Sequence, residues 1–353
     1  MSYSAMVVNA GAKEFNIGVL YWSMNIPGQV AMRKGLEAEA ESINRSVALA
    51  GSESVIKNQG EKNVVKPAIR LETRVAGDGE AGIENQIQQM NELVKMQVDL
   101  IIVQPTDNAA LAGPLRAANK ARIPVVAYDQ YISGGKLAAY RTSDNYQAGY
   151  LDGEYISSRF PKEREIRIVL VEYPHVSSTV ERVNGFLDAI KESGKPHRVL
   201  KSYSAVEPVG GKKAGTDILK DFPEVGTVDV IFTVNDGGGL SVVKALADAG
   251  RSEIMTATID GDPSSVENIV AGRLTVIDSA QFCGPLGAEA MKTAYAILTG
   301  GKPPYHALVP VFPITQETLK LYPGWLGPIP SGFTKPWKSK LPEWKGNLNI
   351  VEQ

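Results

Sequence analysis

The sequence predicts an α/β protein made of two similar Rossmann-like lobes, each with a parallel sheet. Short apolar runs alternate with helical stretches of about ten to fifteen residues, which is typical of right-handed βαβ crossovers. The chain also repeats itself, because the apolar runs 98–103 and 228–233 both begin with Val-Asp. Each leads through a helical stretch to a strand that ends in an aspartate, Asp129 or Asp260. At 353 residues, the chain can form two domains with separate cores.

The individual elements follow from apolar periodicity. In the first half we expect helices where apolar residues recur every three to four positions, over 29–44, 83–96 and 109–121, and strands at the apolar runs 16–22, 69–75, 98–103 and 125–128. The same criteria in the second half predict helices over 179–193, 210–221 and 239–249, and strands at 166–171, 198–202, 228–233, 254–259 and 274–278. Residues 46–66 are polar without periodicity, so we expect a surface loop there.

Composition excludes several classes of protein. The 37 basic and 39 acidic residues are well mixed and the net charge is −2, which leaves no basic face for nucleic acid. No apolar run approaches the ~20 residues of a membrane helix. Cys283 is the single cysteine and the three histidines are scattered, so we expect neither a disulfide nor a metal site.

One glycine-rich segment has the pattern of a cofactor-binding turn. Residues 77–82 form a G-x-G-x-x-G between a predicted strand and a predicted helix, as in dinucleotide-binding turns. Asp78 and Glu80 would place two carboxylates against the pyrophosphate, and they fit better as acidic residues of a helix start. We therefore expect no cofactor and no enzyme, and an NAD-dependent oxidoreductase is the least favoured alternative. Neither G-x-S-x-G nor H-E-x-x-H is present.

Polar residues follow the carboxyl ends of the predicted strands in both halves, where open α/β sheets bind ligands. Carboxylates, amides and an arginine can satisfy hydroxyls that both donate and accept, and an aromatic ring can cover a sugar face, so the set suits a polyhydroxy ligand. The candidate ligand-binding residues are Trp22, Asn25, Gln29, Asp129, Gln130, Ser178, Arg182, Asn235, Asp260 and Gln281.

A structural role is the alternative for each candidate. Asp and Asn after strands are common helix N-caps, and Gln29 and Gln130 could be ordinary surface residues. Arg182 could form only a surface ion pair, and Trp22 could belong to the core. Recurrence at one edge of both half-sheets favours the binding interpretation.

The order and spacing of several segments resemble the periplasmic sugar-binding proteins of ABC importers, the group of ribose-, galactose- and arabinose-binding proteins with the type I periplasmic binding protein fold. The resemblance covers about residues 16–315, and these segments carry it: Asn25-Ile-Pro27, Gln104-Pro-Thr-Asp107, 123–129, Thr142-Ser-Asp-Asn145, Glu181-Arg182, Val234-Asn-Asp236, Ile259-Asp-Gly261 and Ala280-Gln281. It implies sugar contacts by Asp129, Arg182, Asn235, Asp260 and Gln281. The aromatic pair that ribose binders carry after the first strand is replaced by Gly28 and Gln29, which favours another small sugar or polyol.

The resemblance also implies how the chain is divided. We expect a first lobe of residues 15–130 plus 262–282, with a helix continuing to about 300, and a second lobe of 131–261 plus 302–353. A three-strand hinge is expected near 128–132, 260–263 and 279–285. Ligand would bind between the lobes and close the hinge. The proline- and tryptophan-rich segment after residue 320 is longer than the family usually has.

The implied function is capture of a small sugar or polyol and its delivery to an ABC transporter permease, with no nucleic acid and no membrane insertion. A sensory receptor of the same fold, passing ligand state to a membrane sensor, is the alternative. We expect a periplasmic, exported protein. Residues 1–12 do not form an intact signal peptide, and we interpret them as the remnant of a trimmed leader; a cytoplasmic protein with a frayed N-terminus is the other interpretation.

Overall fold

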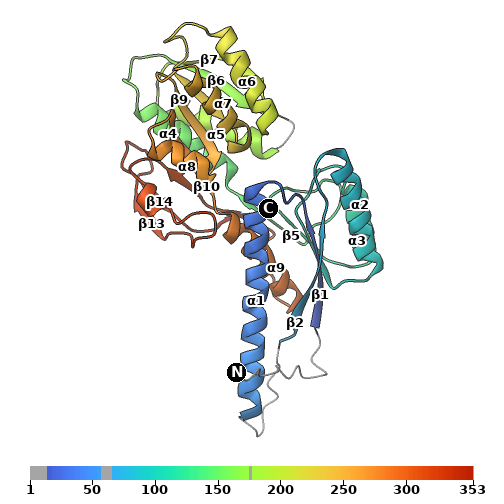
Figure 1. Cartoon of the computed structure of the whole chain (residues 1–353). Coiled ribbons are helices and arrows are strands. Elements are labelled where there is room, and N and C mark those ends of the chain that lie inside the picture. Colours follow the sequence, from blue (N-terminus) through green and yellow to red (C-terminus); the bar gives the residue numbers. More distant parts are fainter. Residues whose placement is uncertain (1–13, 57–65, 175–176, 353) are drawn as a thin grey trace, which may run out of the picture. The chain divides into compact units, whose positions relative to one another are not determined.

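The computed structural model describes residues 14–56, 66–174 and 177–352, and its elements are labelled in Figure 1. The chain folds into two compact units. The first contains the chain up to Arg141 together with Leu286–His306, and the second contains Thr142–Pro285 together with the chain from Ala307 onward. The α/β fold with two lobes and mainly parallel sheets is confirmed.

The expected boundaries differ from the observed ones at residues 262–282. This segment belongs to the second unit, because its strand β10 (Thr275–Gln281) pairs with β9 (Met255–Asp260). The expected assignment of 262–282 to the first lobe is therefore wrong. The chain passes between units after Arg141, Pro285 and His306, so the passages expected near 128–132 and 260–263 are wrong. Residues 131–141 and 302–306, expected in the second lobe, belong to the first unit. A strand that ends in polar residues can border a ligand site, or it can lead into the other unit. The sequence pattern is the same in both cases, so it could not distinguish them.

The first unit is built on a parallel sheet in the order β2–β1–β3–β4–β5. Its strands are β1 (Glu14–Tyr21), β2 (Ala68–Val75), β3 (Leu100–Val103), β4 (Val125–Tyr128) and β5 (Ala139–Ser143), the last of which continues into the second unit. Its helices are α1 (Pro27–Ile56), α2 (Gly79–Lys95), α3 (Ala112–Lys120) and most of α9 (Cys283–Leu298). Helices α2 and α3 pack together and α1 contacts β2.

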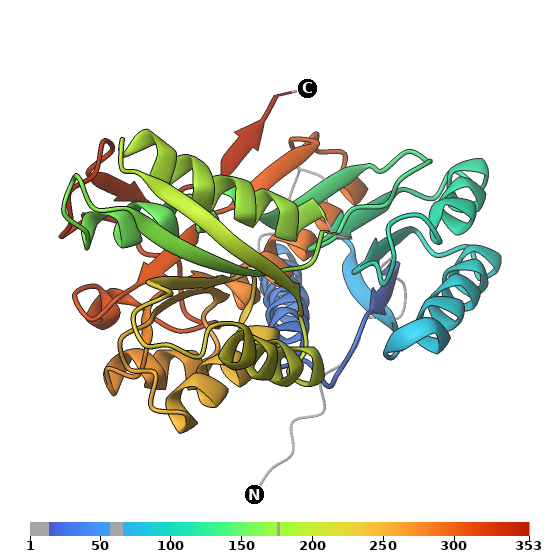
Figure 2. The ribbon, with the colours of Figure 1, turned by 90° about the horizontal axis from the view of Figure 1, so that it is seen from above.

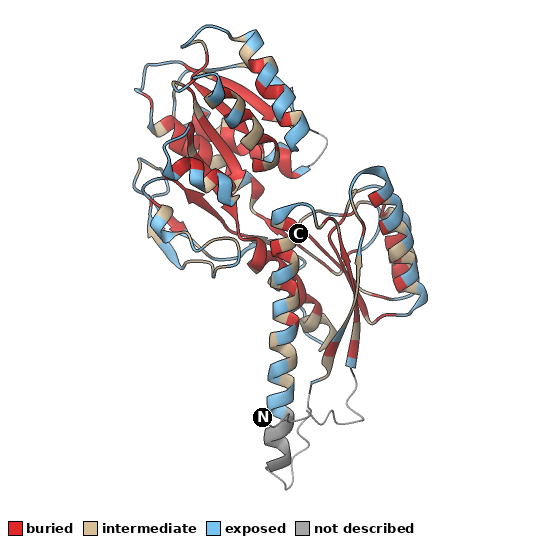
Figure 3. Ribbon diagram, in the orientation of Figure 1, coloured by how far each residue is buried: buried red, intermediate tan, exposed pale blue. Residues whose placement is uncertain are grey.

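Helix α1 corrects the loop expected at 46–66, because it continues to Ile56. None of residues 41–50 of α1 is buried, and Arg45, Ala48 and Leu49 are exposed, so this stretch lacks the buried apolar face that produces a helical periodicity. The exposed and half-buried colours along this part of the helix are visible in Figure 3. Two i,i+4 ion pairs, Arg33–Glu37 and Glu41–Arg45, run along its surface. Residues 57–65 of the expected loop lie outside the described residues.

The second unit has a sheet in the order β12–β10–β9–β8–β6–β7, parallel except that β12 is antiparallel to β10. The remaining strands of this sheet are β6 (Ile166–Glu172), β7 (His197–Ser204), β8 (Val230–Thr233) and β12 (Val311–Ile314). Helices α4 (Asn145–Ser158) and α5 (Ser177–Glu192) pack together on one face, and α6 (Pro208–Asp221) and α7 (Asp236–Asp248) pair on the other, where α8 (Pro263–Val270) also contacts α7 (Figure 2).

A long tail, residues 322–352, completes the second unit. It follows the short helix η1 (Leu319–Leu321) and contains the hairpin β13 (Gly332–Thr334) and β14 (Glu343–Lys345), and then β15 (Asn349–Val351), which lies beside β11 (His306–Val309). Trp344 is buried and donates its indole N–H to the Val311 carbonyl at 2.8 Å. Phe333 and Trp344 pack on Phe312 with ring centroids 5.3–5.4 Å apart. The tail is therefore part of the folded body.

The buried residues concentrate in the strands of each unit (Figure 3). Strands β3, β4 and β8 are buried along their whole length, as expected for parallel strands covered on both faces. Their carboxyl ends carry the polar residues considered next.

Candidate functional site

Helices α4 and α5 approach closely in the second unit, and this sets the position of Arg182. Gly149 lies against the Arg182 carbonyl so tightly that a Cβ there would collide with it. Gly153 meets the Phe186 carbonyl and Gly185 meets that of Tyr146 in the same way. Small residues permit this spacing because they let backbones approach. The guanidinium of Arg182 is thus held against the start of α4.

Arg182 is a buried hub of hydrogen bonds. Its Nε donates to the Asn145 side-chain oxygen at 2.9 Å, and its Nη1 donates to the Val234 carbonyl at 2.8 Å. The same Nη1 donates to Oδ1 of Asp260 at 3.1 Å, forming an ion pair. The Arg182 side chain is 7% exposed and the Asp260 side chain is 25% exposed, so solvent reaches the ion pair from the side of the aspartate. The alternative of a plain surface ion pair for Arg182 is excluded.

Asp260 ends β9 in an unusual backbone conformation, with φ at 133°. Non-glycine residues adopt this region at a cost of ~1–3 kcal/mol, and such strain concentrates at ligand-binding positions. Oδ1 of Asp260 also accepts from Gln281 Nε2 at 2.6 Å. Burial raises the pKa of Asp260 above its usual value, and the donors of Arg182 and Gln281 partly offset this effect. Gln281 in turn accepts from the Ser143 hydroxyl at 2.8 Å.

Asn235 and Asp236 serve the backbone beside this cluster. The Asn235 side-chain oxygen caps α7 by accepting the Gly238 N–H at 3.2 Å, and its Nδ2 donates to the Val206 carbonyl. Asp236 is buried and accepts from Thr258 and from the Asp262 N–H. Asn235 therefore caps the N-terminus of α7, which was the structural alternative for this residue.

The candidates of the first unit form contacts of a different kind. Buried Gln29 accepts the Ser23 N–H at 2.8 Å, and exposed Asn25 donates to Asp78 Oδ2 at 2.7 Å. Asp129, with φ at 64°, accepts from Gln104 Nε2 at 3.0 Å. These contacts are local supports of the strand ends.

The remaining candidates of both units have simpler surroundings. Trp22 is half-buried directly after β1, and its carbonyl accepts the Gly77 N–H at 2.9 Å. Gln130 is half-buried and its N–H donates to the Tyr128 carbonyl. Ser178 is buried in the first turn of α5. Asp78 of the glycine motif occupies the N-cap position of α2, where its carboxylate accepts from Asn25.

The structure thus joins Arg182, Asp260 and Gln281 directly, three of the five residues to which the resemblance assigned sugar contacts. Asn145 was missed as a candidate although it is buried and holds the guanidinium of Arg182. Its signal was available, because the segment Thr142-Ser-Asp-Asn145 is one of those that carry the resemblance. Buried Gln104, the partner of Asp129, was likewise left out of the candidate set.

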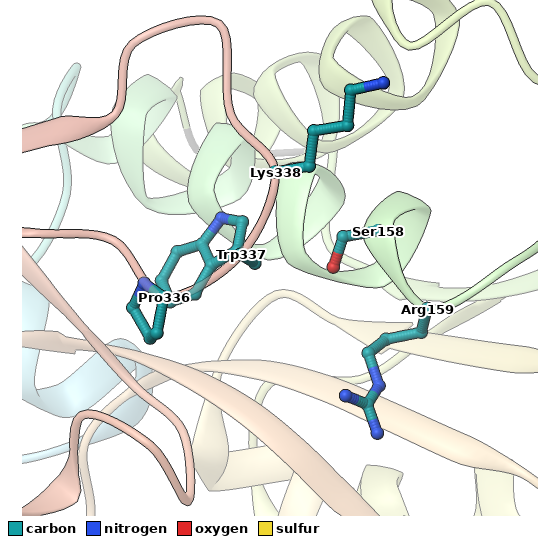
Figure 4. Close-up of a pocket in the computed structure, with 5 residues that line it drawn as sticks. All are labelled: Ser158, Arg159, Pro336, Trp337 and Lys338. Atoms are coloured by element: carbon teal, nitrogen blue, oxygen red, sulfur yellow. The ribbon is translucent and has the colours of Figure 1, made fainter.

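A pocket of about 360 Å³ lies elsewhere in the second unit, where α4 ends beside the tail. Ser158, Arg159, Pro336, Trp337 and Lys338 line it (Figure 4), and it includes no candidate residue. Within the described residues, no group of three or more His, Cys, Asp or Glu side chains is placed to hold a metal ion. His175 lies outside the described residues.

Across the described part of the chain, none of the helices combines the length and apolar character needed to span a membrane.

Known proteins share this fold and sequence pattern. A family model for the periplasmic binding protein domain matches residues 17–302. The ribose import binding protein of Escherichia coli is 25% identical over 295 residues, which cover 83% of this chain and 88% of that protein.

Two solved structures are similar as well. An ABC transporter periplasmic solute-binding protein from Actinobacillus succinogenes with bound D-allose has a TM-score of 0.71 and 23% identity, covering 88% of this chain and 100% of that one. An ABC transporter solute-binding protein from Bacillus halodurans with bound myo-inositol has a TM-score of 0.72 and 20% identity, covering 89% and 99%. Both show the fold.

The two α/β units with polar strand ends define a protein of the bilobal binding-protein class. Because the family model matches well over half of its length, the chain belongs to the periplasmic binding protein domain family.

Proposed function

We propose that this chain is a solute-binding protein that captures a small sugar or polyol and delivers it to an ABC transporter permease. The buried cluster of Arg182, Asp260 and Gln281 supports this proposal most directly. A positive φ and an ion pair hold the Asp260 carboxylate at a strand end with part of its surface open to solvent.

The chemistry of the cluster suits hydroxyl groups. A guanidinium and an amide donate, a carboxylate accepts, and vicinal hydroxyls of a sugar or polyol can meet both kinds of partner at once. Trp22 and Tyr131, both partly exposed, could offer rings to an apolar sugar face. We propose that all ten candidates lie around the ligand and that Asp129 and Asp260 contribute the carboxylates of the two lobes.

The proposed role in transport is supported by the names of similar proteins. The relative from Escherichia coli is named a ribose import binding protein, and both solved structures are named ABC transporter solute-binding proteins. We therefore propose that the chain is exported to the periplasm and that its ligand-bound form meets a membrane permease. Closure of the lobes on the ligand remains a prediction, which small-angle scattering with and without ligand would test.

A calorimetric screen of aldopentoses, aldohexoses, inositols and linear polyols tests the ligand class. We expect at least one to bind, and at 100 times its dissociation constant to add ~2.7 kcal/mol of stability in thermal unfolding. Binding confined to amino acids or nucleotides would contradict the proposal. A second assay separates transport from sensing. If the ligand-bound protein stimulates the ATPase of a permease, its role is transport.

A matched pair of arginine variants tests the site. Arg182→Ala removes a buried guanidinium and should weaken binding by ~2–4 kcal/mol, about 30- to 1,000-fold. Arg198→Ala alters an exposed arginine that pairs with Glu165 and should leave affinity unchanged. Equal affinities for the two variants would remove Arg182 from the site.

A further inference from the structure

The tail lies outside the residues matched by the family model, yet it reaches the strand end that carries Asp260. Trp325 donates its indole N–H to the Asp260 carbonyl at 2.7 Å. Its own carbonyl accepts the Gly284 N–H at 2.8 Å, which ties this part of the tail to the start of α9. Neither contact involves the Asp260 carboxylate.

The Asp260–Gly261 peptide is held from both sides. Its carbonyl accepts from Trp325, and its N–H donates to Asp278 Oδ1 at 2.9 Å. A Cβ on Gly261, which has φ at 79°, would lie 2.9 Å from the Tyr322 hydroxyl of the tail. A residue with the backbone strain of Asp260 keeps its conformation only when its surroundings fix it. The tail supplies one of these fixing contacts.

The first unit contains a similar contact. Asp129 directly follows β4 and also has a positive φ, 64° against 133° for Asp260, and its carbonyl accepts from the Tyr140 hydroxyl at 3.2 Å. In both units an aromatic side chain therefore donates to the carbonyl of the strand-end aspartate. The first unit takes its donor from β5, and the second takes it from the tail.

We propose that Trp325 is a positioning residue: by binding the Asp260 carbonyl, it orients the Asp260 carboxylate toward Arg182 and Gln281. The tail then acts on ligand affinity without touching ligand. The expected effect of Trp325 on ligand affinity rests on the proposed function. The expected effect of Trp325 on Arg182 rests only on the geometry of the second unit.

Trp325→Phe tests the proposal, with Trp337→Phe as the matched control. Both variants keep an aromatic ring and lose one indole hydrogen bond. The bond lost in Trp337→Phe is the one from Trp337 to Glu154 at 3.0 Å, which lies away from Asp260. Loss of one hydrogen bond should weaken ligand binding about 3- to 10-fold for Trp325→Phe. Trp337→Phe should leave affinity unchanged. Equal losses in the two variants would overturn the proposal.

A double-mutant cycle separates positioning from general destabilisation. In the Asp260→Ala background there is no carboxylate to orient, so Trp325→Phe should cause no further loss of affinity. Additive losses would mean that Trp325 acts by another route, and would overturn the proposal.

A measurement without ligand distinguishes this proposal from the proposed function. The Nε–H signal of Arg182 in a ¹⁵N correlation spectrum, assigned by its loss in Arg182→Ala, should shift in Trp325→Phe and stay in place in Trp337→Phe. An unmoved signal in both variants contradicts the positioning role even if sugars bind. If no sugar or polyol binds the natural protein, the proposed function fails, while a selective shift still supports the positioning of Asp260.

Discussion

Asp129 directly follows β4 and Asp260 ends β9, the corresponding strands of the two units, and the surroundings of these two residues differ. Both have positive φ, both accept from a glutamine side chain, and both have an aromatic donor at the carbonyl. Asp260 adds an ion pair with buried Arg182, whose guanidinium is held by Asn145 and the Val234 carbonyl. Among the first-unit candidates, Gln29 and Asn25 instead support local backbone and a loop.

The two units therefore place an aspartate at the same point of their sheets but in different environments, and the φ angles of 64° at Asp129 and 133° at Asp260 differ as well. The second unit surrounds its aspartate with a preorganised charged network, which reduces the ordering that ligand binding must supply. We therefore expect variants of the second unit to affect affinity more than the matching variants of the first.

The largest effect is expected where α4 and α5 touch. Gly149→Ala places a methyl group against the Arg182 carbonyl, so the helices must separate and the guanidinium must move. We expect a loss of ~3 kcal/mol or more in urea unfolding, together with weaker ligand binding. Gly113→Ala in α3 is the control, because a Cβ there meets nothing within 4 Å, and it should be neutral or slightly stabilising. Similar losses in both variants would contradict the close-packing argument.

The paired aspartates give the next comparison. Asp260→Ala leaves the buried charge of Arg182 without its carboxylate and should cost ~2–3 kcal/mol of folding stability, discounted for the partial exposure of Asp260. Asp129→Ala removes the partner of Gln104 and should cost ~1 kcal/mol. Chemical denaturation measures both. A larger loss for Asp129→Ala would reverse the comparison between the units.

The pH dependence of stability provides a third test of the second unit. Burial raises the pKa of Asp278 to about 8, far above the ~3.9 of an unfolded aspartate. Between these values the folded chain holds a proton that the unfolded chain has released. Through Asp278 alone, the free energy of unfolding should therefore fall by up to ~1.4 kcal/mol per pH unit as pH rises from about 4 to 8.

Urea unfolding at pH 5, 6, 7 and 8 measures this slope. Tryptophan fluorescence reports mainly on the second unit, which contains Trp325, Trp337 and Trp344. Asp278→Asn, which cannot titrate, should reduce this slope, while the raised pKa values of Asp152, Asp236 and Asp260 maintain the rest of the dependence. A slope that persists unchanged in this variant would assign it to other groups.

The smallest effect is expected at Gln29. Its side chain satisfies the buried Ser23 N–H, so Gln29→Ala should cost ~1 kcal/mol of stability. Affinity should fall less than in Arg182→Ala. Lys34→Ala, at an exposed position of the same helix, is the control and should change stability by less than ~0.5 kcal/mol. An affinity loss as large as that of Arg182→Ala would place Gln29 among the principal ligand contacts.

Much of the fold could be predicted because it depends on local patterns. Buried parallel strands such as β4 and β8 are continuous apolar runs, and the spacing between them requires crossover helices. The continuation of α1 beyond residue 44 could not be predicted in this way, since none of residues 45–50 is buried and such a stretch shows no apolar periodicity. The placement of β10 depends on pairing with β9, which is a nonlocal choice.

The sequence by itself determined the two-lobed α/β class, the repeated strand-end aspartates and the polar residues at the sheet edges. Each depends on residue type and on spacing along the chain. Only the tertiary structure decided which polar residues meet. The close approach of α4 and α5 joins Arg182 to Asn145, and the fold of the tail brings Trp325 to Asp260, 65 positions away in the sequence. Such contacts depend on three-dimensional packing between distant segments, and local periodicity carries no information about them.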